Sequence, residues 1–360
     1  MTISKEKIER IIRPEVRGLS AYHVPDPGGL IKLDAMENPY SWPDWLVEVW
    51  LEQLRQVSLN RYPDASANAL KARMRNAMGI PDQAAVILGN GSDELIQMII
   101  QAVAGPGKVI MAPEPTFVMY RQIAVVTGLA YAAVPLQTDY SLDRDIIAAA
   151  LDEYQPAVVF LAYPNNPTGN LFDPDVIRVI LARAPGLVVV DEAYAPFTDE
   201  SFMDEVQAHD NLLVLRTLSK MGFAGLRLGL LAGAPDWLNE IEKTRLPYNI
   251  SSLNQLTGEF ALAHREVFDE QAAMIRKDRT VLLAGLQTLP GLTAYPSAAN
   301  FILFRVSAGQ AGGVHAGLKE RGILIKNLDG SAPALRDCLR VTVGRPQENA
   351  AFLAALTALL

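Results

Sequence analysis

The sequence of 360 residues has one cysteine and only four histidines. A single cysteine cannot form an internal disulfide or a CxxC zinc motif, which favours a reducing compartment, and we expect the cytoplasm. The histidines are scattered without metal-ligand spacing, so no metal site is expected; they are His23, His209, His264 and His315.

Long apolar runs and an excess of basic residues are also missing. No uninterrupted apolar segment is long enough to cross a bilayer, and the N-terminal residues MTISKEKIERII lack the apolar core of a signal peptide. The formal net charge is −8, whereas nucleic-acid-binding proteins usually carry a basic surface. We therefore expect neither a membrane nor a nucleic acid as partner, and an anionic substrate would need local Arg and Lys side chains.

Short apolar runs alternate with helical patterns between residues 86 and 231, which predicts a mostly parallel sheet covered by helices on both faces. The predicted strands are Val86–Leu88, Val109–Met111, Val158–Leu161, Val188–Val190, Leu212–Leu215 and Leu228–Leu231. Three later strands, Phe301–Val306, Ile323–Ile325 and Leu339–Val343, predict a smaller α/β unit. The expected organisation is an N-terminal arm or part of the small domain (1–35), a large domain (36–260) and a small domain (261–360).

Lys220 follows the predicted strand Leu212–Leu215, in the string TLSK. A lysine held at a strand end suits covalent catalysis, because its amine can form a Schiff base with a carbonyl. Ser219 and Arg227, which flank it, can both bind phosphate oxygens. A lysine and phosphate ligands are the minimum set of residues needed to bind pyridoxal phosphate (PLP). The alternative interpretation is that Lys220 is an ordinary surface lysine after a strand.

The string LGNGSDE at residues 88–94 places a glycine-rich turn between a strand and a helix. Ser92 is a favourable N-cap, and Asp93 falls in the first turn. Free backbone N–H groups and the helix dipole make such a terminus an anion site, with a plain tight turn as the alternative. The spacing is not GxGxxG, so it is no dinucleotide fingerprint.

Three further strand ends carry polar side chains. PNNPTG at residues 164–169 presents Asn166, whose amide can donate to an aromatic oxygen, unless the string only closes a turn. Asp191 follows three valines, where ligands bind in open parallel sheets, and its carboxylate could pair with a protonated pyridine nitrogen or cap a helix; Tyr194 follows three residues later. Arg340, in LRVTVG, could grip a carboxylate or phosphate, or form a structural salt bridge.

Together and in this order, these strings resemble the fold-type-I PLP-dependent aminotransferases over residues 34–344. The finer similarity is to the histidinol-phosphate aminotransferase family, through Tyr22 in the arm, ENPY at Glu37–Tyr40, RYPD at Arg61–Asp64, PTF and MY within Pro115–Tyr120, and Arg345 after LRVTVG. The resemblance implies an α/β fold with a mostly parallel seven-stranded sheet between helices and a smaller α/β domain.

The resemblance also implies the roles of the cofactor site. Lys220 would bind PLP covalently and shuttle the proton, Asp191 would pair with the pyridine nitrogen, and Asn166 and Tyr194 would bond the ring oxygen. Phe117 would stack on the ring. The residues implied to hold the cofactor phosphate are Gly91, Ser92, Asp93, Ser219, Arg227 and, from the neighbouring subunit of a homodimer, Tyr62.

For the substrate, the resemblance implies that Tyr22, Asn38, Arg340 and Lys326 line the pocket. The reaction would be transamination between L-histidinol phosphate and 2-oxoglutarate or glutamate, in histidine biosynthesis. Two positions depart from the family. Phe117 replaces a frequent Tyr, so the hydrogen bond of the tyrosine hydroxyl is lost while ring stacking remains possible. Lys326 replaces an expected Arg, so the single charge of an ammonium group replaces the two-pronged guanidinium.

Other functions of the same fold compete with this one. An aromatic or broad-specificity aminotransferase, or a threonine-phosphate-type decarboxylase, would use the same cofactor residues. A regulator that only binds PLP is disfavoured because every expected catalytic residue type is present. A nicotinamide oxidoreductase is disfavoured by the glycine spacing.

Overall fold

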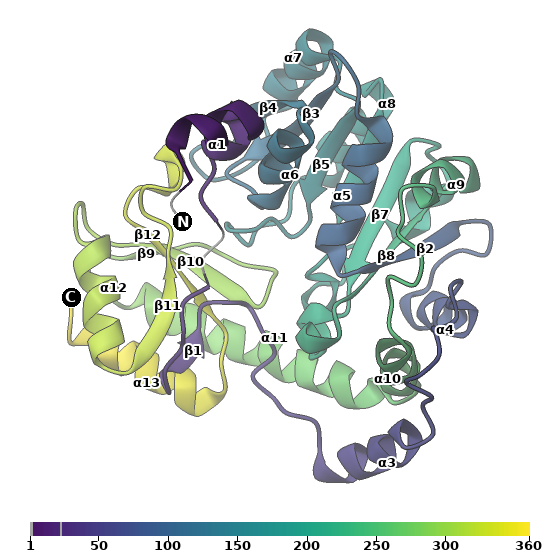
Figure 1. Ribbon diagram of the computed structural model, residues 1–360. Coiled ribbons are helices and arrows are strands. Elements are labelled where there is room, and N and C mark those ends of the chain that lie inside the picture. Colours follow the sequence, from purple (N-terminus) through teal and green to yellow (C-terminus); the bar gives the residue numbers. More distant parts are fainter. Residues whose placement is uncertain (1–2, 22–23) are drawn as a thin grey trace.

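The computed structural model describes residues 3–21 and 24–360 and arranges the strands in two separate sheets (Figure 1). Seven strands form the larger sheet, in the order β2–β8–β7–β6–β5–β3–β4. Their bounds are β2 Ala85–Asn90, β3 Val109–Glu114, β4 Ala130–Pro135, β5 Val158–Ala162, β6 Leu187–Asp191, β7 Leu212–Thr217 and β8 Leu228–Gly233. Only β8 runs antiparallel to its neighbours among these described strands, which confirms the mostly parallel seven-stranded sheet.

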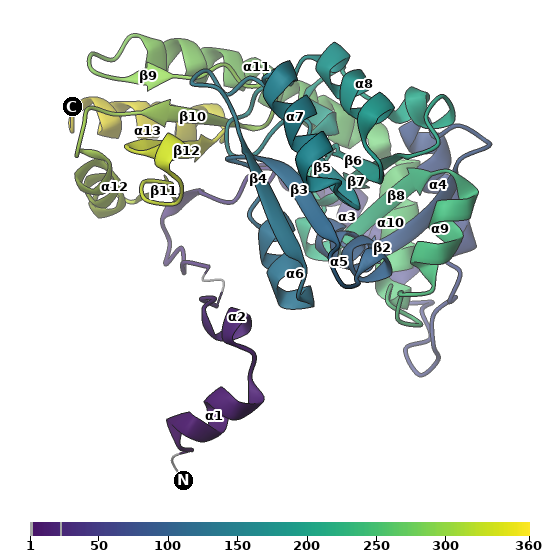
Figure 2. The same ribbon diagram turned by 90° about the horizontal axis from the view of Figure 1, so that it is seen from above.

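Helices cover both faces of this sheet, and its central strands are therefore apolar at every position. On β5, Val158 and Phe160 belong to the core on one face, and Val159 and Leu161 to the core on the other. Figure 2 shows this layering. The surrounding helices are α3 Asp44–Leu54, α4 Asn68–Met78, α5 Ser92–Val103, α6 Met119–Thr127, α7 Arg144–Tyr154, α8 Pro174–Arg183, α9 Pro235–Glu242 and α10 Ser252–Ala263.

Among the described strands of the larger sheet, the edge strand β4 is the one that the apolar runs did not indicate; β1 (Ile31–Leu33) and β9 (Thr293–Ala294) of the smaller sheet were also not predicted. The β4 sequence AYAAVP has three alanines, which have a weak strand propensity, and β4 pairs only with β3. The six predicted strands of the larger sheet are correct in position but too short; on β6 and β7, for example, the polar residues Asp191 and Thr217 continue the pairing at the carboxyl ends. These extensions carry site residues.

The smaller sheet has the order β1–β11–β12–β10–β9. Its strands are β1 Ile31–Leu33, β9 Thr293–Ala294, β10 Phe301–Arg305, β11 Ile323–Asn327 and β12 Cys338–Thr342, and its helices are α12 Ala311–Glu320 and α13 Pro346–Thr357. β1 pairs in parallel with β11, so the N-terminal segment completes this sheet. On β12, Leu339 and Val341 enter the apolar core while Arg340 alternates with them, as the strand pattern predicts.

The long helix α11 (Arg265–Gln287) joins the two sheets (Figure 1). At its start Phe268 packs against Phe223 with ring centroids 4.3 Å apart, and near its end Leu282 and Leu286 enter the core of the smaller sheet. The predicted domain boundary after residue 260 falls inside α10, so the division of the chain stays a prediction.

The N-terminal helices α1 (Lys5–Ile11) and α2 (Pro14–Arg17) project away from both sheets (Figure 2). The Arg13 guanidinium between them donates to the backbone carbonyl of Val126 on α6. Among the described residues, no helix has the length and apolar character required to cross a membrane.

Candidate active site

An inner cavity of about 560 Å³ opens where β5, β6 and β7 end and α5 begins. Carboxyl ends of parallel strands are the usual ligand position in open α/β sheets. The cavity brings together most of the predicted cofactor residues. Its lining consists of Met36, Ser92, Asp93, Phe117, Ala162, Asn166, Asp191, Ala193, Tyr194, Thr217, Ser219, Lys220 and Arg227.

Asp191 is the last residue of β6 and is only 4% exposed. Its Oδ2 accepts a hydrogen bond from the Tyr120 hydroxyl at 2.7 Å, and its Oδ1 accepts one from the backbone N–H of Ala193 at 3.1 Å. Burial raises the pKa of the Asp191 carboxyl to about 6, and these two hydrogen bonds oppose the rise. The carboxylate is thus held in one orientation at the floor of the cavity.

Sequence reasoning assigned no role to Tyr120. It lies on α6 with Ile123 and Ala124 on the buried face, a pattern typical of core packing. Its ring stacks on Phe160 at 4.7 Å and meets Phe117 edge-on at 5.5 Å. The same short segment therefore positions both the ring of Phe117 and the carboxylate of Asp191, and only the folded structure reveals that link.

Lys220 lies in the short 3-10 turn Ser219–Met221 directly after β7. Its Nζ donates to the Ala35 carbonyl at 3.4 Å and lies 5.8 Å from the centroid of the Tyr194 ring. Burial first, and the positive charge of Arg340 second, lower the pKa of the Lys220 ammonium to about 8. At pH 7 about a tenth of this amine is therefore unprotonated, far more than for an ordinary lysine, and is able to act as a nucleophile or base.

The opposite end of the cavity, at the first turn of α5, is the candidate anion site. Gly91, rather than the predicted Ser92, is the N-cap, with φ 85°, so the helix starts at Ser92 and its first backbone N–H groups belong to Ser92 and Asp93. Arg227 Nη2 bonds Asp93 Oδ2 at 3.1 Å. Ser219 completes this end, and its hydroxyl accepts a hydrogen bond from Thr217 at 2.9 Å.

Glycines let the backbone close around this anion site. A Cβ at Gly91 would lie 2.6 Å from Arg227 Nη2, and one at Gly229 would lie 2.8 Å from the backbone of Gly91 and Ser92. Such distances are shorter than real Cβ contacts, so a larger residue would push the guanidinium or β8 away from the turn. The GNGSDE and GLRLG strings are thus two halves of one cradle.

Arg340, on β12 of the smaller sheet, contacts Asn166, a residue that lines the inner cavity. Its Nη1 donates to Asn166 Oδ1 at 2.5 Å, and its Nη2 donates to the Asp34 carbonyl at 3.1 Å. Since Arg340 occupies the amide oxygen, the Asn166 NH₂ group is directed to other acceptors, as the predicted bond to a ring oxygen requires. Arg340 and Asn166 are both buried, so this pair also ties the two sheets together.

Met36 is a second site residue that sequence reasoning missed. It has φ 54°, in the left-handed region that costs a non-glycine residue energy, and this conformation is held by the bond from its N–H to Thr342 Oγ1 at 2.9 Å. Its sulfur accepts a hydrogen bond from the Tyr194 hydroxyl at 3.2 Å. Nothing in the string DAMENPY predicts that Met36 has a left-handed backbone conformation or that its sulfur contacts Tyr194.

An outer cavity of about 970 Å³ adjoins the inner one. Met36, Phe117 and Asn166 line both. Arg340 and Lys326 line only the outer cavity, where they are paired directly opposite each other on β12 and β11, so their side chains project from the same face. The two predicted substrate cations are therefore brought together.

Other predicted residues lie elsewhere. The Asn38 amide donates to the Met221 carbonyl at 3.2 Å and to Gln271 Oε1 at 2.9 Å, and it lines neither cavity. Tyr62 is 80% exposed and stacks on Tyr248 with centroids 4.4 Å apart. Tyr22 lies outside the described residues. The substrate roles of Asn38 and Tyr22 stay predictions.

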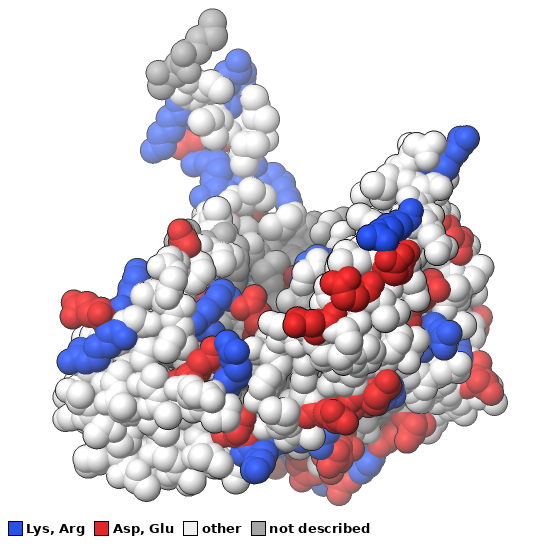
Figure 3. Space-filling model, turned by 90° about the horizontal axis from the view of Figure 1, so that it is seen from below, with Lys and Arg blue, Asp and Glu red and all other residues white. Residues whose placement is uncertain are grey.

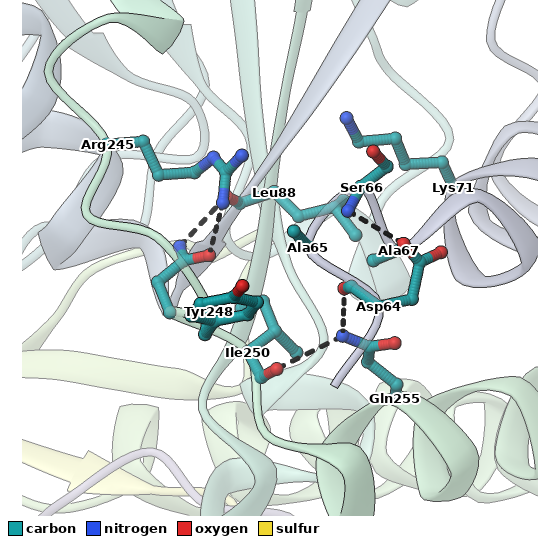
Figure 4. Close-up of a pocket in the computed structure, with 11 residues that line it drawn as sticks. Asp64, Ala65, Ser66, Ala67, Lys71, Leu88, Arg245, Tyr248, Ile250 and Gln255 are labelled. Carbon is teal, nitrogen blue, oxygen red and sulfur yellow. Dashed lines mark hydrogen bonds between the residues drawn. The ribbon is translucent and has the colours of Figure 1, made fainter. Parts of the chain in front are cut away.

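Figure 4 shows the pocket beside Tyr248, a small one of about 240 Å³ lined by Asp64, Lys71, Arg245 and Gln255 among others. Gln255 donates to the carbonyls of Asp64 and Ile250 at 2.8 and 3.1 Å. This pocket contains none of the predicted catalytic residues. Tyr62, which stacks on the lining residue Tyr248, is largely exposed, as a residue that serves another subunit would need to be.

The charge on the surface is mixed. On the face in Figure 3, acidic and basic side chains are interspersed rather than gathered by sign. With a net charge of −8, an anionic substrate gains nothing from the protein's overall charge. Its recognition depends on the cations that line the two cavities.

The raised pKa of Asp191 predicts a pH-dependent stability in the cofactor-free protein. The pKa of the Asp191 carboxyl is about 6 in the folded protein and 3.8 as the ordinary value, so the folded state binds the proton more tightly. The stability that the protonated carboxyl provides is fully present below about pH 4 and is lost as the pH rises through 6. A shift of this size corresponds to about 3 kcal/mol. Urea unfolding of the wild type and of Asp191→Asn across pH 4 to 7 should show this loss as the difference between them.

Tyr120→Phe is the matched test of the cause. Because the Tyr120 hydroxyl lowers the Asp191 pKa, its removal should move the stability loss to higher pH, while Asp191→Asn removes it. Parallel curves for the wild type and Asp191→Asn over that pH range would contradict the assignment.

Comparisons with known proteins identify relatives along nearly the whole chain. The sequence profile of the aminotransferase class I and II family matches residues 29–356. Histidinol-phosphate aminotransferase 2 of Nitrosococcus oceani is 57% identical over 356 residues, 99% of each chain. Histidinol-phosphate aminotransferase of Chromobacterium violaceum is 51% identical over 352 residues, 98% of each chain.

Solved structures show the same fold. Histidinol-phosphate aminotransferase from Sinorhizobium meliloti, in complex with pyridoxal-5'-phosphate, superposes with a TM-score of 0.86 at 21% identity and covers 97% of each chain. The L-threonine-O-3-phosphate decarboxylase from Porphyromonas gingivalis reaches a TM-score of 0.79 at 22% identity, covering 91% of this chain and 99% of its own. Structural likeness at this identity shows the fold alone.

Proposed function

Because the chain belongs to the aminotransferase class I and II family, we propose that it transfers the amino group of L-histidinol phosphate to 2-oxoglutarate with PLP as cofactor. The observation that carries this proposal is the pairing of two cavities. The inner one holds Lys220 and Asp191, and the outer one is lined by Arg340 and Lys326. A substrate with a reacting amine at one end and a phosphate at the other matches that arrangement. Relatives at 50% identity or more carry the same activity in their names.

The residues present fit PLP. The inner cavity offers an amine for an aldehyde, a buried carboxylate for a ring nitrogen, and an anion cradle for a phosphate, at three different places on its wall. Phe117 supplies a flat apolar face for stacking. Lys220 would hold the cofactor covalently, Asp191 would pair with its ring nitrogen, and the first turn of α5 with Ser219 and Arg227 would hold its phosphate.

When bound, PLP supplies an electron sink for the carbon that carries the amine. Lys220 moves the proton at that carbon, and its pKa of about 8 lets it both accept and return a proton near neutral pH. Asp191, fixed by Tyr120 and the Ala193 N–H, provides a negative charge that keeps a ring nitrogen protonated. Asn166 and Tyr194 line the same cavity and would orient the ring oxygen.

The positive charges in the outer cavity select the substrates. Arg340 and Lys326 offer positive charge to the phosphate of histidinol phosphate and, in the second half of the reaction, to a carboxylate of 2-oxoglutarate. One cationic site used in turn by both substrates requires that the first product leave before the acceptor enters. Ping-pong kinetics are the expected result.

The exposed position of Tyr62 supports a homodimer with shared sites. Tyr62 of one subunit would then reach the cofactor phosphate of the other. Co-expressed Lys220→Ala and Tyr62→Ala subunits test this, because a mixed dimer regains one intact site only if Tyr62 acts across the interface. We expect activity in the mixture well above that of either variant alone; no gain on mixing would place Tyr62 outside the shared site.

Product analysis tests the function. Purified protein with PLP, L-histidinol phosphate and 2-oxoglutarate should form glutamate and the keto phosphate in equal amounts, without release of CO₂. Activity with aromatic amino acids but none with histidinol phosphate would assign a broad-specificity aminotransferase. Release of CO₂ without any need for 2-oxoglutarate would assign a decarboxylase.

A further inference from the structure

A third cation, Arg121, lines the outer cavity together with Lys326 and Arg340. Among the residues that line this cavity, Glu114 is the one carboxylate. Three positive charges and one negative charge leave a local excess of two positive charges around this cavity, in a protein with a net charge of −8. This excess of positive charge would complement an anion that carries two negative charges.

The three cations approach the cavity from two sides. Lys326 and Arg340 are opposite each other on β11 and β12 of the smaller sheet. Arg121 lies on α6, which covers the larger sheet, four residues after Phe117, and therefore about one helical turn beyond the ring that both cavities share. An anion between Arg121 and Lys326 would be held across the gap between the two sheets.

The three cations differ in how many of their N–H donors form hydrogen bonds within the protein. Arg340 gives one terminal nitrogen to Asn166 and the other to the Asp34 carbonyl. In the described part of the chain, neither Arg121 nor Lys326 has a carboxylate within 4.0 Å or a side-chain hydrogen bond, and the Arg121 guanidinium is 6.0 Å from the centroid of the Tyr131 ring. Both residues line the outer cavity, and among the described residues neither side chain donates a hydrogen bond to a protein acceptor.

We propose that Arg121 is a specificity-determining residue whose guanidinium binds the substrate phosphate jointly with Lys326. This inference rests on the proposed function and names a residue of its phosphate site. Lys326 alone offers a point charge, whereas a guanidinium offers the planar fork that matches two phosphate oxygens. Arg121 supplies that fork from α6.

Arg121→Gln tests the role by comparing two amino donors on the PLP-loaded enzyme. We expect kcat/KM for L-histidinol phosphate to fall about tenfold or more, chiefly through KM, with no change for L-histidinol, which has no phosphate. Arg121→Lys should lose less, because it keeps the charge but not the fork. The matched control is Arg144→Gln on α7, an exposed arginine that lines neither cavity, and it should change neither value.

Binding of inorganic phosphate provides a readout apart from turnover. Calorimetric titration of the PLP-loaded enzyme with phosphate should give a dissociation constant about tenfold weaker for Arg121→Gln than for the wild type and Arg144→Gln. Equal losses with L-histidinol and L-histidinol phosphate, or an unchanged phosphate affinity, would overturn the role of Arg121. A wild-type enzyme that turns over no histidinol phosphate would overturn the proposed function, and this inference with it, whereas an active wild type with an unaffected variant would overturn only the inference.

Discussion

Lys220→Ala should abolish transamination, with kcat lowered by about four orders of magnitude or more. Lys220 is the amine that holds the cofactor and also the base that moves the proton, so its loss removes nucleophilic and general-base contributions together. Steady-state assays with L-histidinol phosphate and 2-oxoglutarate at saturating PLP measure the effect. The variant should still bind PLP without the covalent bond, and the cofactor should then be removed by dialysis.

Lys319→Ala is the matched control for that loss. Lys319 is an exposed lysine on α12 that lines neither cavity, so its removal should leave kcat and cofactor retention unchanged. Appreciable turnover by Lys220→Ala, with a cofactor that still resists dialysis, would require another lysine to hold PLP and would refute the assignment.

Asp191→Asn is expected to lower kcat by about two to four orders of magnitude with little change in KM. Asp191 is buried and would form an ion pair with the ring nitrogen, and removing one partner of a buried ion pair costs about 3–5 kcal/mol. An amide keeps the shape of the carboxylate but not its charge, so the electron sink weakens while substrate contacts persist. Assays at saturating PLP separate this loss from weaker cofactor binding.

The control for the charge is Asp175→Asn, which removes a carboxylate from the exposed first turn of α8. It should leave kcat within about twofold, as surface substitutions usually do. Asp191→Glu keeps the charge at a shifted position and should fall between the two. Turnover by Asp191→Asn close to that of the wild type would show that the ring nitrogen needs no anionic partner in this site.

The sequence predicted the parts of the site that stand at strand ends. Lys220, Asp191 and Asn166 each follow a buried apolar run, and parallel strands bring their carboxyl ends to one edge. Arg340 was predicted from an alternating strand pattern. These signals are local, since each depends on a few neighbouring residues and on the geometry of one strand.

Residues whose role depends on distant partners were not predictable in that way. Tyr120 reads as a core residue of an amphipathic helix until α6 is docked beside Asp191. Met36 and Arg121 are recognised as site residues because they line cavities between the two sheets, and the periodicity of the sequence does not predict those cavities. The edge strand β4 was missed because its alanines carry almost no strand signal.

The most direct test of the account is the absorption spectrum of the PLP-loaded protein during titration with L-histidinol phosphate in the absence of an acceptor. The yellow aldehyde form of the cofactor should convert stoichiometrically to the amino form, and 2-oxoglutarate should restore the original spectrum. A spectrum that histidinol phosphate leaves unchanged, but that aromatic amino acids convert, would contradict the proposed substrate.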